Sequence, residues 1–295
     1  MTGWNGTGLP PVAAQRVQRA AQGGPWTSLL SVPAAAGLRV AGLEPAGEVM
    51  GSMVQQISLV GASCGTYWPG PGGWVAGGPV AAPLGPRGFG PYLDALNLGY
   101  ATALDRMTQE ATALGADGIV GITLATVPLG GAVEFTALGT AVRAPGHQRP
   151  GRVFTTALSG QDVAKLMTAG WVPAVLVYGI SVAVRHDDWQ SRAQASWGAG
   201  NVEVDGYTQL IGHTRADARA RLARQTRATG ADGAIVSSMG LRLWSVEPSE
   251  RHRDHVAEAT VFGTAIARFA TTATPAAGRP LTILPLHHTP SGSTS

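Results

Sequence analysis

The chain has 295 residues, of which 44% are hydrophobic and only 13% charged, and its formal net charge is +3. This small charge does not require a nucleic-acid partner. The single cysteine, Cys64, excludes an intrachain disulfide framework. No apolar stretch approaches the ~20 residues needed to cross a bilayer. The N-terminus carries no charged segment followed by an apolar core, so no signal peptide is predicted. We therefore expect a cytoplasmic protein, and the shortage of surface charge indicates burial against other subunits.

The two ends of the chain are poor in residues that can build a core. Residues 1–26 are rich in Gly, Pro, Gln and Ala and predict a flexible arm, in which residues 14–21 could form two helical turns. Residues 271–295 are mainly small and polar and predict a disordered tail. Residues 61–90 hold ten glycines and five prolines, which predicts a long loop.

The region 27–145 predicts a folding unit with the order β-β-α-β-β. Residues 37–58 are typical of two strands with a bend near Pro45. A helix follows, because apolar residues recur at spacings of three and four and Gly115 lies where a left-handed residue ends a helix. Residues 117–144 then predict a hairpin of two strands. The apolar helix positions are Leu93, Leu96, Tyr100, Leu104, Met107, Ala111 and Leu114.

The region 152–270 repeats the first after a linker over residues 146–151. The segment Ala113–Val120 returns 115 positions later as Ala228–Ile235, and Glu134–Val142 returns 124 positions later. Near the start, residues 39–43 can be aligned with residues 162–166 at an offset of 123. The repeat predicts an α+β protein of two tandem β-β-α-β-β units, each an antiparallel sheet with one helix. In the second unit we expect strands within 153–184, a helix over 214–229 and strands over 233–244 and 256–267.

Several of these residues carry a known family pattern. The first unit has the pattern in Arg106–Ala111, in Leu114–Gly121 and in Gly139–Val142, whereas the second keeps only Gly230–Gly233 and Gly263–Ile266 and is divergent. The pattern resembles the YbjQ-like family, often labelled heavy-metal-binding. The resemblance implies a dodecin-subunit-like fold and homo-oligomeric rings, commonly pentamers, and it implies no established reaction.

A metal site is the first function that this resemblance suggests. Soft-metal carriers use paired thiolates, and this chain has one cysteine. A harder ligand set is His252, His255 and Glu258, which could suit zinc on a helical turn. Glu134 matches Glu258 across the repeat and could line a subunit interface or ring lumen, where it could bind a cation. The alternative is that the charged stretch 247–255 is a solvated loop; no cofactor other than such a divalent metal is expected.

The repeated Gly-Ala-Asp-Gly motif has two interpretations. Asp117 and Asp232 could act as general bases or as ligands for a hard cation. They could instead accept hydrogen bonds from backbone amides where the helix turns into a strand, next to the helix-ending glycines Gly115 and Gly230. We favour the structural interpretation, because the flanking glycines already explain the motif.

The sequence has no arrangement of nucleophile, base and orienting residue that predicts catalysis. We therefore predict a non-enzymatic protein that forms a ring-type assembly or a binding module. The alternative is a metal- or small-ligand-binding protein with sites at unit interfaces. Nucleic acid is not an expected partner, because aromatic residues are not interleaved with the arginines of the second long helix. Those arginines are Arg215, Arg219, Arg221, Arg224 and Arg227, and the tryptophans Trp68, Trp74, Trp189 and Trp197 could anchor a partner or pin their loops to the core.

Overall fold

The computed structural model describes residues 4, 8–22, 27–57, 80–81, 89–146, 150–249 and 252–269. The predicted tail, Cys64 and most of the predicted loop 61–90, with Trp68 and Trp74, lie outside these residues. The fold is mixed α+β, as the sequence predicts, and no helix in the described ranges is long and apolar enough to span a membrane. The elements in chain order are α1 (Pro11–Ala21), α2 (Val32–Val40), β1 (Glu44–Gln56), β2 (Val80–Ala81), α3 (Gly90–Ala113), β3 (Gly118–Leu129), β4 (Ala132–Arg143), β5 (Phe154–Thr155), α4 (Gly160–Thr168), β6 (Trp171–His186), α5 (Trp189–Gln194), a 3-10 helix (Trp197–Ala199), α6 (Asp205–Ala228), β7 (Gly233–Ser249) and β8 (His252–Arg268).

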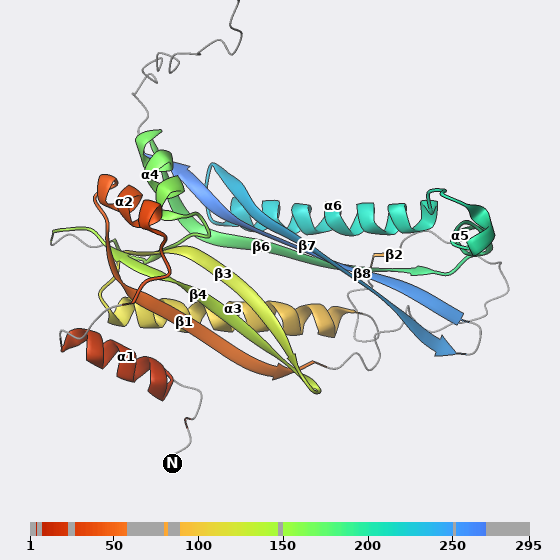
Figure 1. Cartoon of the computed structure of the whole chain (residues 1–295), viewed down its shortest axis with the longest axis horizontal. Coiled ribbons are helices and arrows are strands. Elements are labelled where there is room, and N and C mark those ends of the chain that lie inside the picture. Colours follow the sequence, from red (N-terminus) through yellow and green to blue (C-terminus); the bar gives the residue numbers. More distant parts are fainter. Residues whose placement is uncertain are drawn as a thin grey trace, which may run out of the picture.

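The strands form two sheets that follow one another along the long axis of the molecule (Figure 1). The first has the order β1-β4-β3-β5 and the second the order β2-β6-β8-β7. Neighbouring strands are antiparallel except β5, which pairs in parallel with β3 through Gly118 and Ile119. We refer to residues 27–146, which carry the first sheet, as the first half, and to residues 150–269 as the second half.

One long helix lies on each sheet, with α3 on β1 and β4 and α6 on β6 and β8. Two glycines bring helix and strand backbones into direct contact. A Cβ atom at Gly51 would lie 1.9 Å from the carbonyl oxygen of Ala103, and one at Gly179 would lie 2.0 Å from that of Ala218. No side chain fits in either contact, so glycine is required for this close approach of backbones.

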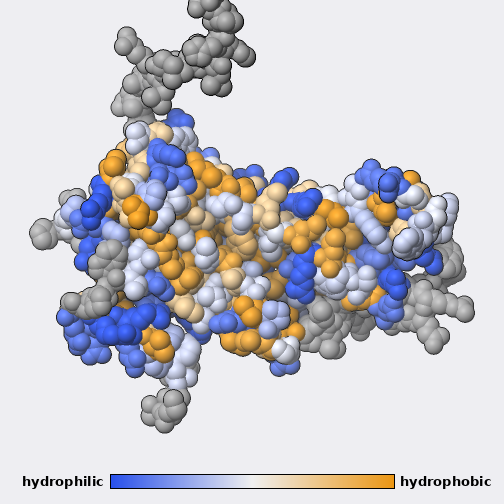
Figure 2. Space-filling view, viewed as in Figure 1, coloured by the Kyte–Doolittle hydropathy of each residue, from blue (hydrophilic) through white to orange (hydrophobic). Residues whose placement is uncertain are grey.

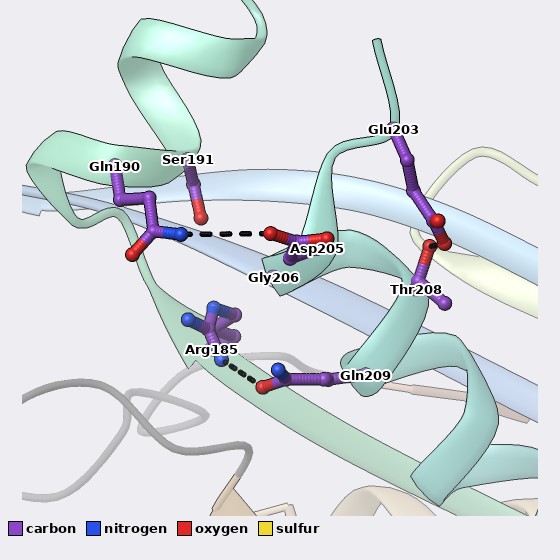
Figure 3. A pocket seen from close by; sticks show the side chains of 8 residues that line it. All are labelled: Arg185, Gln190, Ser191, Glu203, Asp205, Gly206, Thr208 and Gln209. Atoms are coloured by element: carbon purple, nitrogen blue, oxygen red, sulfur yellow. Dashed lines mark hydrogen bonds between the residues drawn. The ribbon is translucent and has the colours of Figure 1, made fainter.

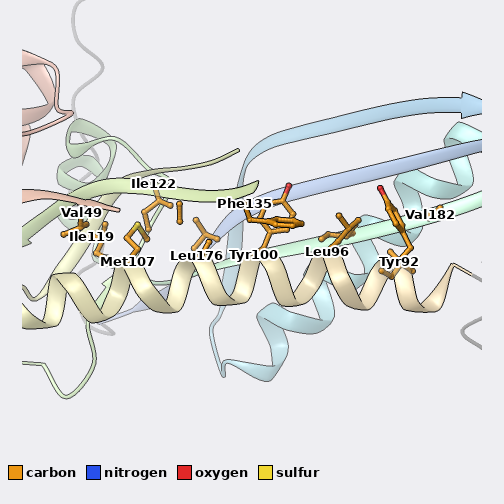
Figure 4. Packing of buried hydrophobic residues seen from close by; sticks show 14 of the residues in the cluster. Val49, Tyr92, Leu96, Tyr100, Met107, Ile119, Ile122, Phe135, Leu176 and Val182 are labelled. Carbon is orange, nitrogen blue, oxygen red and sulfur yellow. The ribbon is translucent and has the colours of Figure 1, made fainter. Parts of the chain in front are cut away.

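The helix α3 also packs against the second sheet, so the two sheets share one core (Figure 4). The ring of Tyr100 lies edge-on to Phe135 of the first sheet, with 5.1 Å between centroids, and edge-on to Phe262 of the second, with 5.4 Å. Tyr92 contacts Trp244 in the same way at 6.3 Å. Because buried aromatic rings carry large apolar areas, these contacts tie the two halves firmly together.

The segments before the long helices differ from the sequence prediction. The sequence predicts two strands over residues 37–58, but they form the end of α2 and the single strand β1, with a register shift after Pro45 in place of the bend. Residues 153–184 likewise form β5, α4 and β6. Ser31 and Ser159 cap α2 and α4 through their hydroxyl groups. These caps, not an apolar period, are the sequence signal for such short helices.

The helix α1 lies within the predicted N-terminal arm and rests on α3 through an ion pair with a buried carboxylate. Arg16 donates from Nε and Nη2 to the two carboxylate oxygens of Glu110, each at 2.7 Å. Glu110 is fully buried, and its Oε2 also accepts the backbone N–H of Met50 at 3.0 Å. One carboxylate therefore joins α1, α3 and β1.

Candidate functional site

The repeated Gly-Ala-Asp-Gly motif lies where each long helix turns into the next strand. Gly115 and Gly230 have φ angles of 67° and 73°, in the left-handed region that glycine adopts without strain. The carboxylate of Asp117 accepts a backbone N–H just after β4 at 2.7 Å, and that of Asp232 accepts one at the end of β8 at 2.8 Å. Each aspartate thus holds the last strand of its hairpin against the helix end.

The predicted metal ligands lie on strands and not on a helical turn. His252, His255 and Glu258 belong to β8, and the side chains of His255 and Glu258, three positions apart on the strand, point to opposite faces of the sheet. Glu134 lies on β4 of the other sheet. Within the described residues, no group of three or more His, Cys, Asp or Glu side chains is placed to hold a metal ion. The hairpin β7–β8 extends to Ser249, so the helical geometry assumed for zinc is not the one that the chain adopts.

His255 takes part in a polar cluster between the second sheet and α6. Its Nε2 lies 3.1 Å from the hydroxyl oxygen of Tyr207 and 3.5 Å from Oδ1 of Asp187. Its Nδ1 lies 3.1 Å from Oγ of Ser245. Both ring nitrogens therefore contact protein groups, and the imidazole joins β8, β7, α6 and the end of β6.

Glu258 belongs to the contact between α3 and the second sheet. Its Oε2 accepts the hydroxyl of Tyr92 at 2.5 Å. Burial, followed by the charge of Glu258, raises the pKa of Tyr92 well above its ordinary value. The same two causes raise the pKa of Tyr100 to about 12. The two phenols stay neutral over the physiological range, which is what a contact between buried surfaces requires.

The stability of the protein is expected to fall as the pH rises from about 10 to about 12. Tyr100 in the folded chain holds its proton up to a pKa of about 12, whereas an unfolded tyrosine loses it near pH ~10. Its contribution is thus complete below the unfolded pKa and is lost as the pH rises through the folded pKa. Urea unfolding at several pH values should show this fall, and Tyr100→Phe should make it shallower. An equally steep fall in the variant would contradict the assignment.

The described residues of the second half enclose a small polar cavity of about 290 Å³ at the start of α6 (Figure 3). Arg185 is a buried member of the lining, in which Nη2 donates to Asp188 at 2.6 Å and Nη1 donates to Gln209 at 3.3 Å. Although burial favours the neutral acid, hydrogen bonds from the Ser191 amide and from Arg185 keep the pKa of Asp188 below its ordinary value. The sequence prediction misses this cavity because it begins the second long helix at residue 214, and α6 begins at Asp205.

The chemistry of this cavity suits hydrogen bonding more than catalysis. The lining carboxylates already have partners: Asp205 accepts the side-chain amide of Gln194 at 2.8 Å, and Glu203 accepts the hydroxyl of Thr208 at 2.7 Å. No His or Cys lines the cavity among the described residues, and the Ser191 hydroxyl hydrogen-bonds to the carboxylate of Asp188, which Arg185 also binds. The full lining is Arg185, Gln190, Ser191, Glu203, Asp205, Gly206, Thr208 and Gln209.

The arginines of the basic helix α6 and the side chains of Trp189 and Trp197 lie mainly on the surface. Asp217 binds Arg221 at 2.8 Å and Ser181 at 2.7 Å, and the other arginines of α6 are exposed. Trp189 and Trp197 are 77% and 105% exposed. Within the described part of the single chain, neither tryptophan packs on the core, so the prediction that they pin their loops to the core is wrong.

Both hairpins leave apolar strand edges uncovered. In the described part of the second sheet, β7 has β8 as its one neighbour, and Val236, Met239 and Leu243 on it are about half exposed. In the first sheet, Val127 and Leu129 at the end of β3 are also about half exposed. Figure 2 shows apolar residues spread across the middle of this face of the molecule. Long uncovered edges are templates for pairing with another strand.

Comparison with known proteins gives two matches. Residues 88–145 match a YbjQ family model described as "Putative heavy-metal-binding", which confirms the resemblance for α3 and the β3–β4 hairpin. Over 271 residues, the chain is 32% identical to a Mycobacterium tuberculosis protein named encapsulin nanocompartment protein Rv1762c. That alignment covers 88% of this chain and 92% of the relative. No solved structure matches the chain.

Proposed function

We propose, from the premise that this chain belongs to the same family as the encapsulin nanocompartment protein of Mycobacterium tuberculosis, that it is a non-enzymatic protein that self-associates into a closed assembly. The name of the relative refers to a compartment, and a compartment is built from repeated contacts between chains. The assembly that the family resemblance favours is a ring of five chains. We further propose that the protein acts in the cytoplasm.

The observation that carries this proposal is the uncovered edge strand β7. This strand of 17 residues is longer and more apolar than an ordinary edge strand that faces solvent. Edge strands are normally short or are protected by charged residues or prolines. Val236 is 48% exposed, Met239 49% and Leu243 54%. The charged residues of β7 are Arg242 and Glu247, so its first nine residues, 233–241, carry no charge. A second chain that pairs with the start of this edge would cover Val236 and the open backbone groups beside it.

The chemistry of the cavity supports a non-enzymatic role. Most of its charged side chains are already paired, and no His or Cys is among its described lining residues. The strongest pKa shifts in the described residues belong to Tyr92 and Tyr100, which lie in the contact between the two sheets. Structural contacts also shift pKa values, so these shifts are explained by the packing of the two sheets.

We also propose that the two halves are tandem copies of one unit, the second divergent, each with a short helix, a strand, a long helix and a hairpin. Matched positions make matched contacts: Gly51 and Gly179 both touch a helix carbonyl. The carboxylate of Glu110 accepts a strand N–H at 3.0 Å, and the amide oxygen of Gln225 accepts one at 2.6 Å. Matched residues of the two halves are 128 positions apart before the long helix, 115 apart within it and 124 apart in the last strand. For the residues before the long helix, the offset of 128 therefore replaces the offset of 123 inferred from the sequence.

The association is expected to be visible in the mass of the purified protein. Size-exclusion chromatography with multi-angle light scattering should give a multiple of the chain mass of 30.2 kDa, five times that mass for a pentamer. The mass should hold over a tenfold dilution if the contacts are extensive. A strict monomer at micromolar concentration would overturn the proposal.

A second candidate function is binding of a small ligand between the two halves. A crevice of about 690 Å³ lies between α3 and the start of the second half, with Leu104, Val153 and Leu176 among its apolar residues and Arg152 at its side. Native mass spectrometry would detect a co-purified ligand. We expect Val153→Trp to fill the crevice and abolish such a mass difference, and a ligand-free spectrum of the wild-type protein would end this candidate.

A further inference from the structure

Residues 154–158 of the second half dock on strand β3 of the first half, and this contact can be compared with the uncovered edge of β7. The segment 154–158 follows the linker and lies along the first residues of β3. The N–H of Thr156 donates to the carbonyl of Ile119 at 2.9 Å, and the N–H of Ile122 donates back to the carbonyl of Thr156 at 3.0 Å. The second half therefore extends the sheet of the first.

An apolar cluster completes this contact. Val163 of α4, from the second half, is fully buried together with Leu38, Leu43, Val120 and Val142 of the first half. Thr156 is also fully buried. The contact therefore combines strand pairing with side-chain packing, as a stable interface does.

The start of the first half has the same local structure as this docking segment, 128 positions earlier. The N–H of Leu29 donates to Oγ1 of Thr140 at 3.1 Å, just as the N–H of Ala157 donates to Oγ1 of Thr264 at 3.1 Å. The N–H of Leu30 donates to Oγ of Ser28 at 3.1 Å, matching Leu158 and Thr156 at 3.0 Å. The segment 28–31 thus already has a docking conformation, which lowers the entropy cost of binding.

This segment has no strand to dock on within the described chain, and several of its residues are less buried than their counterparts. Val32 is 84% exposed and Ser28 is half-buried, whereas their counterparts Gly160 and Thr156 are buried. The residue 128 positions before Phe154 is Trp26, again aromatic, and its placement lies outside the described residues.

The receiving surface is also present a second time, on β7. Residues 117–122 of the first half correspond to residues 232–237 at the offset of 115. The apolar residues that match the buried cluster are only partly buried, namely Leu166, Trp171, Ile235 and Ile266. A Cβ atom at Gly118 would lie 2.1 Å from the ring of Phe154, but one at Gly233 would meet nothing within 4 Å. Within the described part of the chain, nothing explains a glycine at position 233.

From these two unmatched surfaces we infer that the segment 27–36 of one chain docks on the β7 edge, residues 233–237, of a second copy. This inference rests on the proposed self-association and specifies its contact. The donor and the receiver are different surfaces of the same chain, so the contact is heterologous and continues from chain to chain until a ring closes. The N–H of Ser28 would then donate to the carbonyl of Ala234, as Thr156 does to Ile119.

Two positions differ between the internal contact and the one between chains. Gly121 has a φ angle of 64°, and its N–H donates to the carbonyl of Leu158. Its counterpart is Val236, so we do not expect this backbone hydrogen bond in the contact between chains. Gly160 lets α4 touch the carbonyl of Ala34, and its counterpart is Val32, whose side chain holds the helices farther apart. The contact between chains keeps the strand pairing and the apolar cluster, with wider spacing of the short helices.

An engineered disulfide tests the pairing directly. Ile119 pairs with Thr155, so Ala234 of one chain should pair with Thr27 of the next. Neighbouring strands lie about 4.8 Å apart, within the Cα range of about 4.4–6.8 Å that a disulfide spans. We expect Thr27→Cys with Ala234→Cys, in a Cys64→Ser background, to give a ladder of covalent multimers under diamide. Each single-cysteine variant serves as the control and should stay at the mass of one or two chains.

The outcomes separate this inference from the proposed function. A double variant that assembles, judged by light scattering, yet gives no covalent multimers would overturn the docking mode and leave self-association intact. A crosslink confined to one chain, seen as monomer with altered gel mobility, would overturn it as well. A wild-type protein that is monomeric in light scattering would overturn both.

A second variant tests the same edge without a crosslink. Gly233 has open space around it in the single chain, so Gly233→Val should leave the melting temperature of the protomer unchanged. Between chains, the added side chain would meet the docked segment, and we expect at least about a tenfold weaker association. Gly131→Val, at the β3–β4 turn with equally open space, is the matched control and should assemble as the wild type does. An unchanged assembly in Gly233→Val would contradict the inference.

Discussion

Replacing Gly51 or Gly179 with alanine is expected to lower the free energy of unfolding by about 3 kcal/mol at each site. The added methyl group would lie 1.9 Å from the Ala103 carbonyl in the first case and 2.0 Å from the Ala218 carbonyl in the second. Both obstacles are backbone atoms of a long helix, so no side-chain rotation can relieve them. The helix must move away from its strand, and the core beneath it opens.

Urea unfolding measures this loss, and the position of the glycine is the variable that matters. Gly131→Ala is the matched control, because nothing lies within 4 Å of a Cβ atom there, and its free energy of unfolding should change by less than about 0.5 kcal/mol. Equal effects in all three variants would mean that backbone freedom, and not the close approach, determines the cost.

Arg16→Ala is expected to cost about 3 kcal/mol, because it leaves the buried Glu110 carboxylate without its cation. In a Glu110→Gln background the same substitution should cost less than about 1 kcal/mol, since a neutral amide needs only its hydrogen bond. The matched position in the second half, Gln225, already carries an amide that accepts a strand N–H. The cycle of two single and one double variant gives the coupling between the partners.

An exposed arginine on the same helix controls for the loss of charge. Arg19 contacts the Gln15 carbonyl, at 3.4 Å and in solvent, so Arg19→Ala should change the free energy of unfolding by less than about 0.5 kcal/mol. If Arg16→Ala costs as much in the Glu110→Gln background as it does in the wild-type protein, α1 is held by packing and not by the ion pair.

The sequence predicts the parts of this fold in which the spacing of apolar residues agrees with the positions of residues that end helices or form turns. The apolar spacing of Leu93 to Leu114 predicts α3, and Gly115 ends it, because one residue type there satisfies a left-handed turn. The hairpin after it follows from alternation around Gly130. In contrast, α2 and α4 are nine residues each, too short to show a helical period, and only their capping serines indicate them.

The candidate site is less predictable, because it depends on which residues meet across elements. The spacing of His252, His255 and Glu258 suits a metal on a helix, and the residues lie on a strand. Tyr92 meets Glu258 across 166 positions, a contact that no local pattern encodes. Arg185 enters its cavity only because α6 starts nine residues earlier than its apolar period indicates.

The docking of β5 on β3 changes the kinetics of assembly as well as its geometry. Because both partners of that contact belong to one chain, joining them is an intramolecular step at an effective concentration on the order of millimolar. A ring of such chains therefore contains half as many bimolecular joints as a ring of single units with the same circumference. Fewer collisions are needed to close it, and dilution separates it at a lower concentration.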